Sequence, residues 1–377
     1  QAAKAFRSNA KLAAAYDAFC AEQADWLEDY ALFMALKDSH PKKTWNQWPP
    51  TLAKRDPSAL DHARAKMGEA VDFYKFVQFA FFRQWGVLRD YAHQRGIRIV
   101  GDIPFYVAFD SVDVWANPSN FELIPETMEP KLMAGVPPDY FSATGQLWGN
   151  PVYNWKHLEA TGFDWWIKRF KLLTQHVDVI RIDHFRGFEA YWQVPHGEKT
   201  AINGTWAKCP GDAFFHTLEH ELGHLPVWAE DLGLVTPEVA QLRDTFDFPG
   251  MKVLQFAFDD KGAENPYLPF NFEANFVCYT GTHDNDTVVG WWNGMTQKQQ
   301  QQVLEYTGPV LEQDIHWAMI RLAMSSIADT VVVPLQDLLG LGTDARTNVP
   351  GRAKGNWSWR YEQGAITKDV AQKLKAT

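Results

Sequence analysis

The sequence predicts an α/β protein assembled from parallel βα units. Six short apolar segments, of the kind buried on both faces of a parallel sheet, alternate with segments of helical periodicity. Several of these segments end in an acidic residue, and α/β enzymes place their active sites at the carboxyl ends of parallel strands. A (β/α)₈ barrel and a doubly wound open sheet both fit this pattern. In a barrel, two strands would be missing, and we place that gap upstream of Gln1.

The predicted elements follow one another in a regular order. The predicted strands cover residues 97–102, 177–183, 225–230, 251–256, 276–284 and 330–334. The predicted helices cover residues 25–38, 63–94, 165–176, 212–222 and 313–329. Gly96 is expected to end the long second helix, since glycine commonly follows the last helical turn.

Composition narrows the class of partner. The 377 residues include 36 Lys and Arg against 46 Asp and Glu, which leaves a formal net charge of −10. This negative charge argues against nucleic acid as a binding partner. The 17 tryptophans could fill a core or offer flat faces to sugar rings, and composition leaves both open. Three separated cysteines fit a reducing compartment and favour the cytoplasm. No apolar run approaches the roughly 18 residues of a membrane span, so no membrane partner is expected.

One acidic strand end carries Arg181 and Asp183. Side chains two residues apart share one face of a strand, so the guanidinium should lie beside the carboxylate and lower its pKa. An ionised carboxylate at that place suits a nucleophile or an electrostatic stabiliser. A purely structural ion pair at a strand end is the alternative.

Two further strand ends carry acids. Glu230 and Asp231 are adjacent and face opposite ways in a strand, so only one can point into an active site. Apolar and aromatic neighbours can raise the pKa of a carboxyl group, and a general acid needs such a raised pKa. The alternative to a catalytic role is that Asp231 caps the start of a helix. Asp284 and Asp286 lie two apart, and one of them could serve chemistry while the other serves a turn.

Together the three acidic strand ends favour chemistry on a glycosidic bond. That chemistry needs an acid/base and a nucleophile on opposite sides of the bond, and a third anion can oppose the positive charge that develops. Two loops rich in aromatic, Gly and Pro residues, at 102–118 and 135–151, offer flat faces for a sugar. Surface loops packed by their own side chains are the alternative.

At these residues the chain resembles the amylomaltase family of 4-alpha-glucanotransferases, or disproportionating enzymes, which are related to alpha-amylases. The resemblance runs from residues 26–33 to residues 355–359. Its strongest blocks are Gly101-Asp-Ile-Pro, Pro137-Pro-Asp-Tyr-Phe with Trp148-Gly-Asn-Pro, Arg181-Ile-Asp-His-Phe-Arg-Gly, Ala229-Glu-Asp-Leu-Gly and Thr282-His-Asp-Asn-Asp. All five in order are far more specific than any one block.

The resemblance implies roles for individual residues. Asp183 would be the nucleophile, Glu230 the acid/base and Asp284 the stabiliser of the transition state. Arg181 would keep Asp183 ionised and oriented. The residues that would bind substrate are Asp102, Asp139, Tyr140, Phe141, Trp148, Arg181, His283 and Asn348. The family pattern carries Met where Thr347 stands, in the loop that contains Asn348.

The resemblance also implies a fold and a reaction. The fold would be a (β/α)₈ TIM barrel with inserted helical subdomains, its first two strands absent from this chain. Residues 1–377 would form the C-terminal bulk of that barrel, with a helical insertion at about 20–95 and an aromatic cleft loop at about 103–155. We expect the N-terminal part to be missing and this polypeptide alone to be inactive.

The expected reaction is transfer of α-1,4-glucan segments between maltodextrin or amylose donors and acceptors, by a retaining double displacement through a covalent glucosyl-aspartate. No metal or cofactor is expected, and the sequence gives no protein partner. The residues alone also allow hydrolysis of α-glucans, because water can react with the covalent intermediate in place of an acceptor sugar. A non-enzymatic glucan-binding module is a further alternative that the aromatic loops allow.

Two rival motifs carry little weight. His220-Glu221-Leu-Gly-His224 matches the zinc metalloprotease pattern HExxH, but Gly223 and Pro226 should end the helix at or before the second histidine. Residues 340–345 fit GxGxxA loosely, yet no βαβ unit follows, so dinucleotide binding is not expected.

Overall fold

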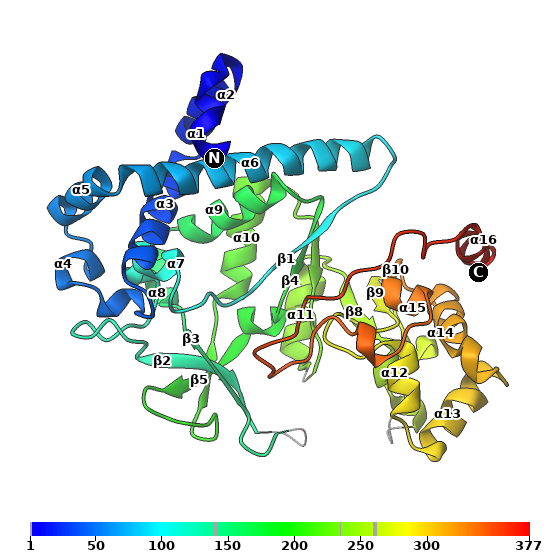
Figure 1. Ribbon diagram of the computed structural model, residues 1–377. Helices are drawn as coiled ribbons and strands as arrows, with labels where there is room; N and C mark the ends of the chain where they lie inside the picture. The colour runs from blue at the N-terminus through cyan, green and yellow to red at the C-terminus, as the bar shows by residue number, and fades with distance from the viewer. Residues whose placement is uncertain (1, 139–141, 234, 259–261) are drawn as a thin grey trace. The chain divides into compact units, whose positions relative to one another are not determined.

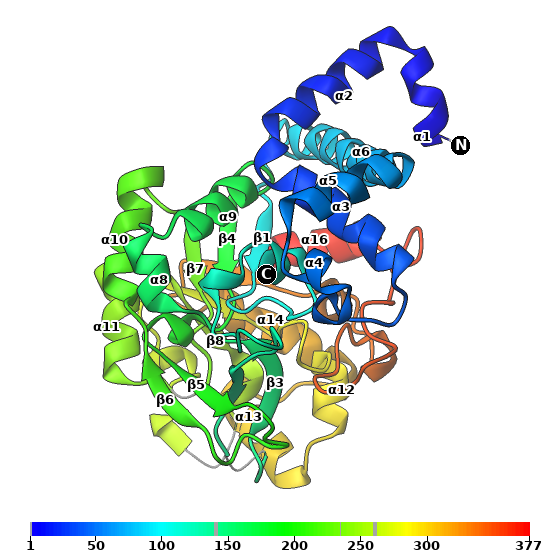
Figure 2. The ribbon, with the colours of Figure 1, turned by 90° about the vertical axis from the view of Figure 1, so that its left-hand side faces the viewer.

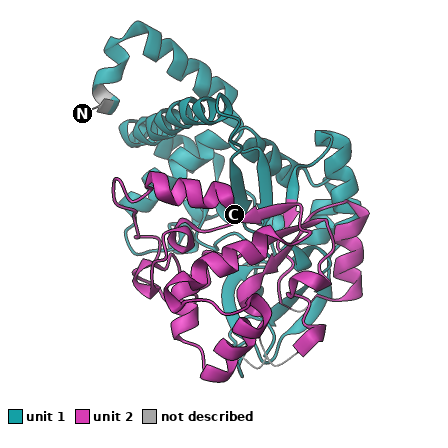
Figure 3. Ribbon diagram, turned by 90° about the vertical axis from the view of Figure 1, so that its right-hand side faces the viewer, with its two compact units in different colours: residues 1–227 teal, residues 228–377 magenta. Residues whose placement is uncertain are grey.

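The computed structural model describes residues 2–138, 142–233, 235–258 and 262–377. The chain divides into two compact units, residues 1–227 and 228–377, which Figure 3 colours separately. Each unit is described by itself. Within the described ranges, no helix combines the length and the apolar character that a membrane crossing requires.

The first unit begins with a helical layer. Its helices are α1 (Ala2–Ala5), α2 (Ala10–Glu22), α3 (Ala24–Ser39), α4 (Pro50–Ala53), α5 (Pro57–Lys66) and α6 (Gly68–His93). The long helix α6 packs against α2 and α3 (Figures 1 and 2). Buried aromatic rings of Phe6, Tyr16, Phe19 and Phe79 hold this layer together.

The long helix predicted over residues 63–94 is confirmed as α6 over Gly68–His93, but its predicted start at residue 63 is wrong. The chain makes two helices there, because Met67 leaves helical geometry with φ −109° and ψ 23° between α5 and α6. The next residue is Gly68, which has low helix propensity, and Asp56 caps the start of α5 through the Ala59 amide. Helical periodicity on both sides of this break hid it from the sequence pattern.

A parallel sheet forms the centre of the first unit. Its strands are β1 (Val100–Ile103), β4 (Val179–Ile182) and β7 (Val227–Ala229), in the order β1-β4-β7. Strand β7 begins at Val227, the last residue of the first unit, and its other two residues belong to the second unit. Strands β1 and β4 pair in parallel, with Asp102 opposite Arg181. The helices α8 (Trp155–Ala160), α9 (Asp164–Thr174) and α10 (Gly211–Leu222) lie between these strands along the chain. Strands β4 and β7 fall inside the predicted segments 177–183 and 225–230, whereas β1 overlaps the predicted segment 97–102 and ends one residue beyond it.

The first unit also contains an antiparallel sheet that the sequence analysis missed. Its strands are β2 (Leu132–Val136), β3 (Gln146–Pro151), β5 (Ala190–Pro195) and β6 (Thr205–Lys208), in the order β3-β2-β5-β6. The stretch expected as an aromatic loop at 103–155 therefore holds two strands, besides the short helix α7 (Val112–Ala116). Gly and Pro in β2 and β3 weaken the strand signal, and β5 lies far along the chain.

Many of the tryptophans serve the core. Trp45, Trp115 and Trp166 are fully buried, and Trp166 packs with Phe188 and Phe214. Trp148 differs, because two fifths of its surface remains exposed. Seven of the 17 tryptophans are buried, so packing explains part of their abundance, and exposed indoles such as that of Trp148 remain available to a ligand.

The second unit is built on another parallel sheet. Its strands β8 (Gly250–Val253), β9 (Phe276–Tyr279) and β10 (Thr330–Val332) run in the order β10-β9-β8. Its helices are α11 (Pro237–Thr245), α12 (Val288–Asn293), α13 (Gln297–Thr307), α14 (Ile315–Met324), α15 (Leu335–Leu338) and α16 (Lys368–Ala376). The last three predicted strands are thus confirmed, and they pair in parallel as the sequence predicted.

Candidate active site

In the first unit, Arg181 joins two carboxylates. The register of β1 and β4 brings Asp102 beside Arg181, whose Nη1 donates to Asp102 Oδ1 at 2.7 Å and to Asp183 Oδ1 at 3.1 Å. The arginine side chain is only 12% exposed, whereas Asp102 and Asp183 are 50% and 45% exposed. The predicted placement of Arg181 beside Asp183 is confirmed. A mainly buried guanidinium thus binds and orients two carboxylates that a ligand can reach.

An aromatic wall stands next to Asp183. His184 adopts a left-handed backbone with φ 51°, and its ring lies 5.1 Å from that of Trp148 and 6.2 Å from that of Tyr106. Burial among these rings, and then the charge of Arg186, lower the pKa of His184 to about 4. The imidazole is therefore neutral at pH 7. The partly exposed Trp148 lies beside it, and Asp139, Tyr140 and Phe141 lie outside the described residues.

Glu230 and its neighbour Asp231 have different surroundings at the end of β7. The carboxylate of Asp231 is buried, accepting from Arg243 Nη1 at 2.6 Å and from the Met251 amide at 2.8 Å. The N-cap alternative for Asp231 is wrong, because α11 begins at Pro237 with Thr236 before it. Glu230 is only partly buried, and its Oε1 accepts from the Leu232 amide at 3.1 Å. Of the two, Glu230 is the candidate for chemistry.

Asp284 lies in the turn that follows β9. Its Oδ1 accepts from Asn348 Nδ2 at 2.5 Å, and its Oδ2 lies 3.4 Å from His283 Nε2. Nearly half of its side chain is exposed. By contrast, Asp286 is tied to the structure, since it accepts from the Thr287 amide and from the Thr343 hydroxyl. Asp284 is therefore the member of the pair that a ligand can meet.

The segment 342–351 lines the turn that carries Asp284. Arg346 Nη2 donates to the Asp284 carbonyl at 2.6 Å, and the Asn348 amide donates to the His283 carbonyl at 3.1 Å. The ring of Trp357 lies 5.1 Å from that of His283. Arg346 and Trp357 were not among the predicted site residues, although both belong to segments that carry the family resemblance. The hydroxyl of Thr347 accepts from Gln336 Nε2 at 2.8 Å, a contact for which Met offers only a weak acceptor.

Glu230 and Asp284 each come after the carboxyl end of a strand. The Ala229 amide at the end of β7 donates to the Pro249 carbonyl before β8, and β8 pairs in parallel with β9. Glu230 therefore follows the carboxyl end of β7, and Asp284 follows the carboxyl end of β9. The carboxyl ends of the strands are where parallel α/β folds hold their catalytic groups.

The rival motifs find no support in the structure. Helix α10 ends at Leu222, so His224 lies beyond it, and the side chain of His220 is largely exposed. Within the part of the chain that the structure describes, no three His, Cys, Asp or Glu side chains gather where they could hold a metal ion. Gly340 and Gly342 follow the short helix α15 and lead into a 3₁₀ turn, not a βα unit.

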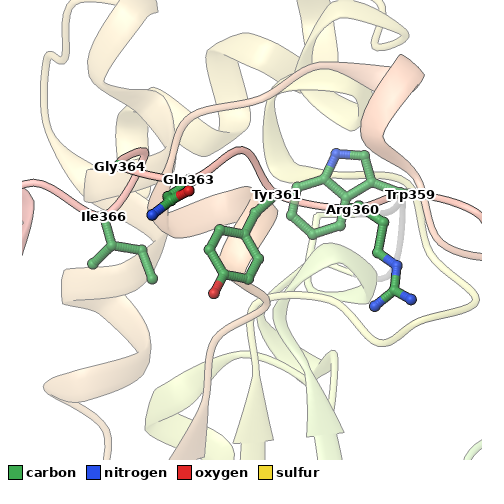
Figure 4. Close-up of a pocket in the computed structure, with 6 residues that line it drawn as sticks. All are labelled: Trp359, Arg360, Tyr361, Gln363, Gly364 and Ile366. Carbon is green, nitrogen blue, oxygen red and sulfur yellow. The ribbon is translucent and has the colours of Figure 1, made fainter.

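A pocket of about 800 Å³ lies along the C-terminal segment of the second unit. It is open to solvent and lined by Trp359, Arg360, Tyr361, Gln363, Gly364 and Ile366 (Figure 4). None of the predicted site residues lines it. The acidic strand ends therefore remain the candidate active site.

Comparison with known proteins gives consistent results. The family model described as 4-alpha-glucanotransferase matches residues 1–367. The 4-alpha-glucanotransferase of Synechocystis sp. is 58% identical over 366 residues, which cover 96% of this chain and 72% of that protein. The one from Thermus thermophilus is 50% identical over 369 residues, covering 96% and 73%. The structure of amylomaltase from Streptococcus agalactiae in complex with acarbose matches with a TM-score of 0.95 at 36% identity, over 99% of this chain and 75% of that one.

The neutral His184 predicts a pH dependence of stability. Its pKa is about 4 in the folded state against an ordinary value of 6.5, so the unfolded chain binds the extra proton first. The free energy of unfolding should therefore fall as the pH drops from about 6.5 to about 4, and His184→Gln should flatten this part of the curve. Urea unfolding across this range measures it, with the exposed His220→Gln as the control. Equal slopes for the His184 variant and the wild type would contradict the prediction.

Proposed function

Since the chain belongs to the 4-alpha-glucanotransferase family, we propose that it transfers α-1,4-glucan segments between maltodextrins through a covalent glucosyl-aspartate. Transferase activity of this kind is supported by the family model over residues 1–367 and by relatives that are 58% and 50% identical. The observation that carries the finer mechanism is the pairing of the accessible Asp183 carboxylate with the mainly buried Arg181. This pairing orients the carboxylate that would act as the nucleophile.

In the proposed first step, a carboxylate oxygen of Asp183 attacks the anomeric carbon of the donor glucan. The bond from that carbon to the leaving oxygen breaks, and Glu230 gives its proton to this oxygen. In the second step, Glu230 takes the proton from a 4-hydroxyl of the acceptor, whose oxygen attacks the same carbon and releases Asp183. Two inversions leave the α configuration unchanged.

Asp284 takes the third role in this proposal. The ring that reacts gains positive charge in the transition state, and a carboxylate nearby stabilises that charge. The 2.5 Å hydrogen bond from Asn348 and the nearby His283 support this role, because they restrict the orientation of the Asp284 carboxylate. Asp102 shares Arg181 with Asp183, so we assign it to orienting the arginine and to binding substrate.

The proposed substrates are maltodextrin and amylose. Trp148 supports this assignment, since an exposed indole beside His184 offers a flat face of the kind that sugars stack on. The similar amylomaltase from Streptococcus agalactiae was solved in complex with acarbose. We further propose that the six parallel strands belong to a (β/α)₈ barrel, and a cytoplasmic location remains a prediction.

Hydrolysis of α-glucans is the second candidate function. A retaining site gives the glucosyl group either to water or to a sugar hydroxyl, and the binding of an acceptor together with the exclusion of water decides which. The same three carboxylates would serve either acceptor. The family membership of the chain favours the sugar.

Product analysis separates the two functions. The enzyme that carries this chain is incubated with maltotriose, without metal or nucleotide, and its products are resolved by length. The proposal predicts glucose together with maltodextrins longer than maltotriose, because each transferred segment lengthens an acceptor. Glucose and maltose alone would show that water is the acceptor, and the hydrolase alternative would replace the proposal.

Two isosteric substitutions test the proposed roles. Glu230→Gln removes the proton donor but keeps its shape, so kcat should fall about 10²–10⁴-fold while calorimetry still detects maltodextrin binding. Asp183→Asn removes the nucleophile and should abolish the covalent intermediate. Glu221→Gln, on helix α10, is the matched control and should keep full activity. Near-normal turnover by either test variant would refute its assigned role.

A further inference from the structure

Helix α15 holds two adjacent buried polar residues that bind different segments. Gln336 is 7% exposed and Asp337 is 1% exposed. Asp337 accepts a hydrogen bond from the Thr280 hydroxyl at 2.6 Å and another from the Val288 amide at 2.7 Å. Gln336 donates to the Ala345 carbonyl at 3.1 Å and to the Thr347 hydroxyl at 2.8 Å. One short helix therefore anchors residues from two separate parts of the chain.

Asp337 joins the two ends of the segment that carries Asp284. Thr280 follows β9 directly, and Val288 is the first residue of α12, so both ends of segment 280–288 meet one carboxyl group. Tying the ends of a loop to one rigid group reduces the conformations available to the residues between them. Asp284 stands at the middle of that segment.

Gln336 anchors the segment that supplies the partner of Asp284. Thr347, which accepts from Gln336, directly precedes Asn348, which donates to Asp284 Oδ1 at 2.5 Å. Arg346, on the other side of Thr347, donates to the Asp284 carbonyl at 2.6 Å. The two anchored segments thus meet at Asp284.

We propose that Gln336 and Asp337 are positioning residues that hold Asn348 and Asp284 in the relative arrangement needed for catalysis. This proposal rests on the proposed role of Asp284. A group held within a fraction of an ångström of its productive place contributes far more to rate than a loosely held one.

The burial of Asp337 is consistent with a role beyond packing. Burial raises the pKa of this carboxyl to about 6, although the hydrogen bonds from Thr280 and Val288 oppose the rise. Burying a carboxyl costs folding free energy that an apolar residue of similar size would not. The residue nevertheless makes two well-formed hydrogen bonds, and both go to the ends of the Asp284 segment.

The test is kinetic and uses the enzyme that carries this chain. Gln336→Met removes the amide with little change in volume, and Gln300→Met removes a similar side-chain bond to the Trp292 carbonyl, away from both segments. We expect kcat of the Gln336 variant to fall about ten- to hundredfold with KM nearly constant, while the Gln300 variant keeps its kcat. The two variants should lose similar amounts of thermal stability. An unchanged kcat, or equal kcat losses in both variants, would overturn the proposal.

Smaller substitutions guard against a variant that fails to fold. Thr347→Val removes the acceptor of the Gln336 bond, whereas Thr347→Ser keeps it. We expect the valine variant to lose kcat as Gln336→Met does, and the serine variant to retain it. Equal activity of both threonine variants would contradict the positioning role.

A double-mutant cycle shows whether Gln336 acts through Asn348. If it does, adding Gln336→Met to Asn348→Ala should lower kcat little further, because the positioned group is already absent. Fully additive losses would overturn this pathway. Asp284→Asn separates the proposed function from the positioning role. An active Asp284 variant refutes the proposed function, whereas an inactive one combined with a fully active Gln336→Met refutes only the positioning role of Gln336.

Discussion

The candidate chemistry depends on the register in which β1 and β4 pair. That register sets Asp102 opposite Arg181, and the alternation of side chains along β4 then brings Asp183 to the same guanidinium. A shift of one residue between these strands would turn Asp102 to the other face and leave Arg181 with one carboxylate instead of two. The glycine at position 101 contributes to this packing, because a Cβ there would lie 2.6 Å from a methyl group of Val177.

Burial decides which acids are available for chemistry. Asp231 and Arg243 form a buried pair, and removing one partner from such a pair usually destabilises a protein strongly. Asp183, Glu230 and Asp284 each keep an accessible face while a neighbour holds them by a hydrogen bond. Position relative to the strand end decides whether an acid is buried or accessible. The adjacent residues Glu230 and Asp231 show this, because Asp231 is buried and Glu230 is only partly buried.

The local sequence predicted what depends on local patterns. All six parallel strands formed where apolar segments predicted them, and the two-residue spacing correctly placed Arg181 beside Asp183. The antiparallel sheet escaped prediction because its strands carry Gly and Pro and find partners far along the chain. The support of Asp284 by Gln336 and Asp337 escaped for the same reason, since sequence spacing does not show which distant side chains meet. The break at Met67 was lost because helical periodicity continues on both sides of it.

The central claim is that Asp183 forms a covalent bond to the donor sugar. Trapping this covalent intermediate tests the claim most directly. The Glu230→Gln variant is treated with α-glucosyl fluoride, whose leaving group departs as fluoride and needs no protonation. The first step should then proceed while the second, which lacks its base, is slow. Peptide mass spectrometry should find a glucosyl group on the peptide that contains Asp183, and Asp183→Asn should abolish it. A stable adduct on another residue, or rapid release of fluoride from the Asp183→Asn variant, would contradict the account.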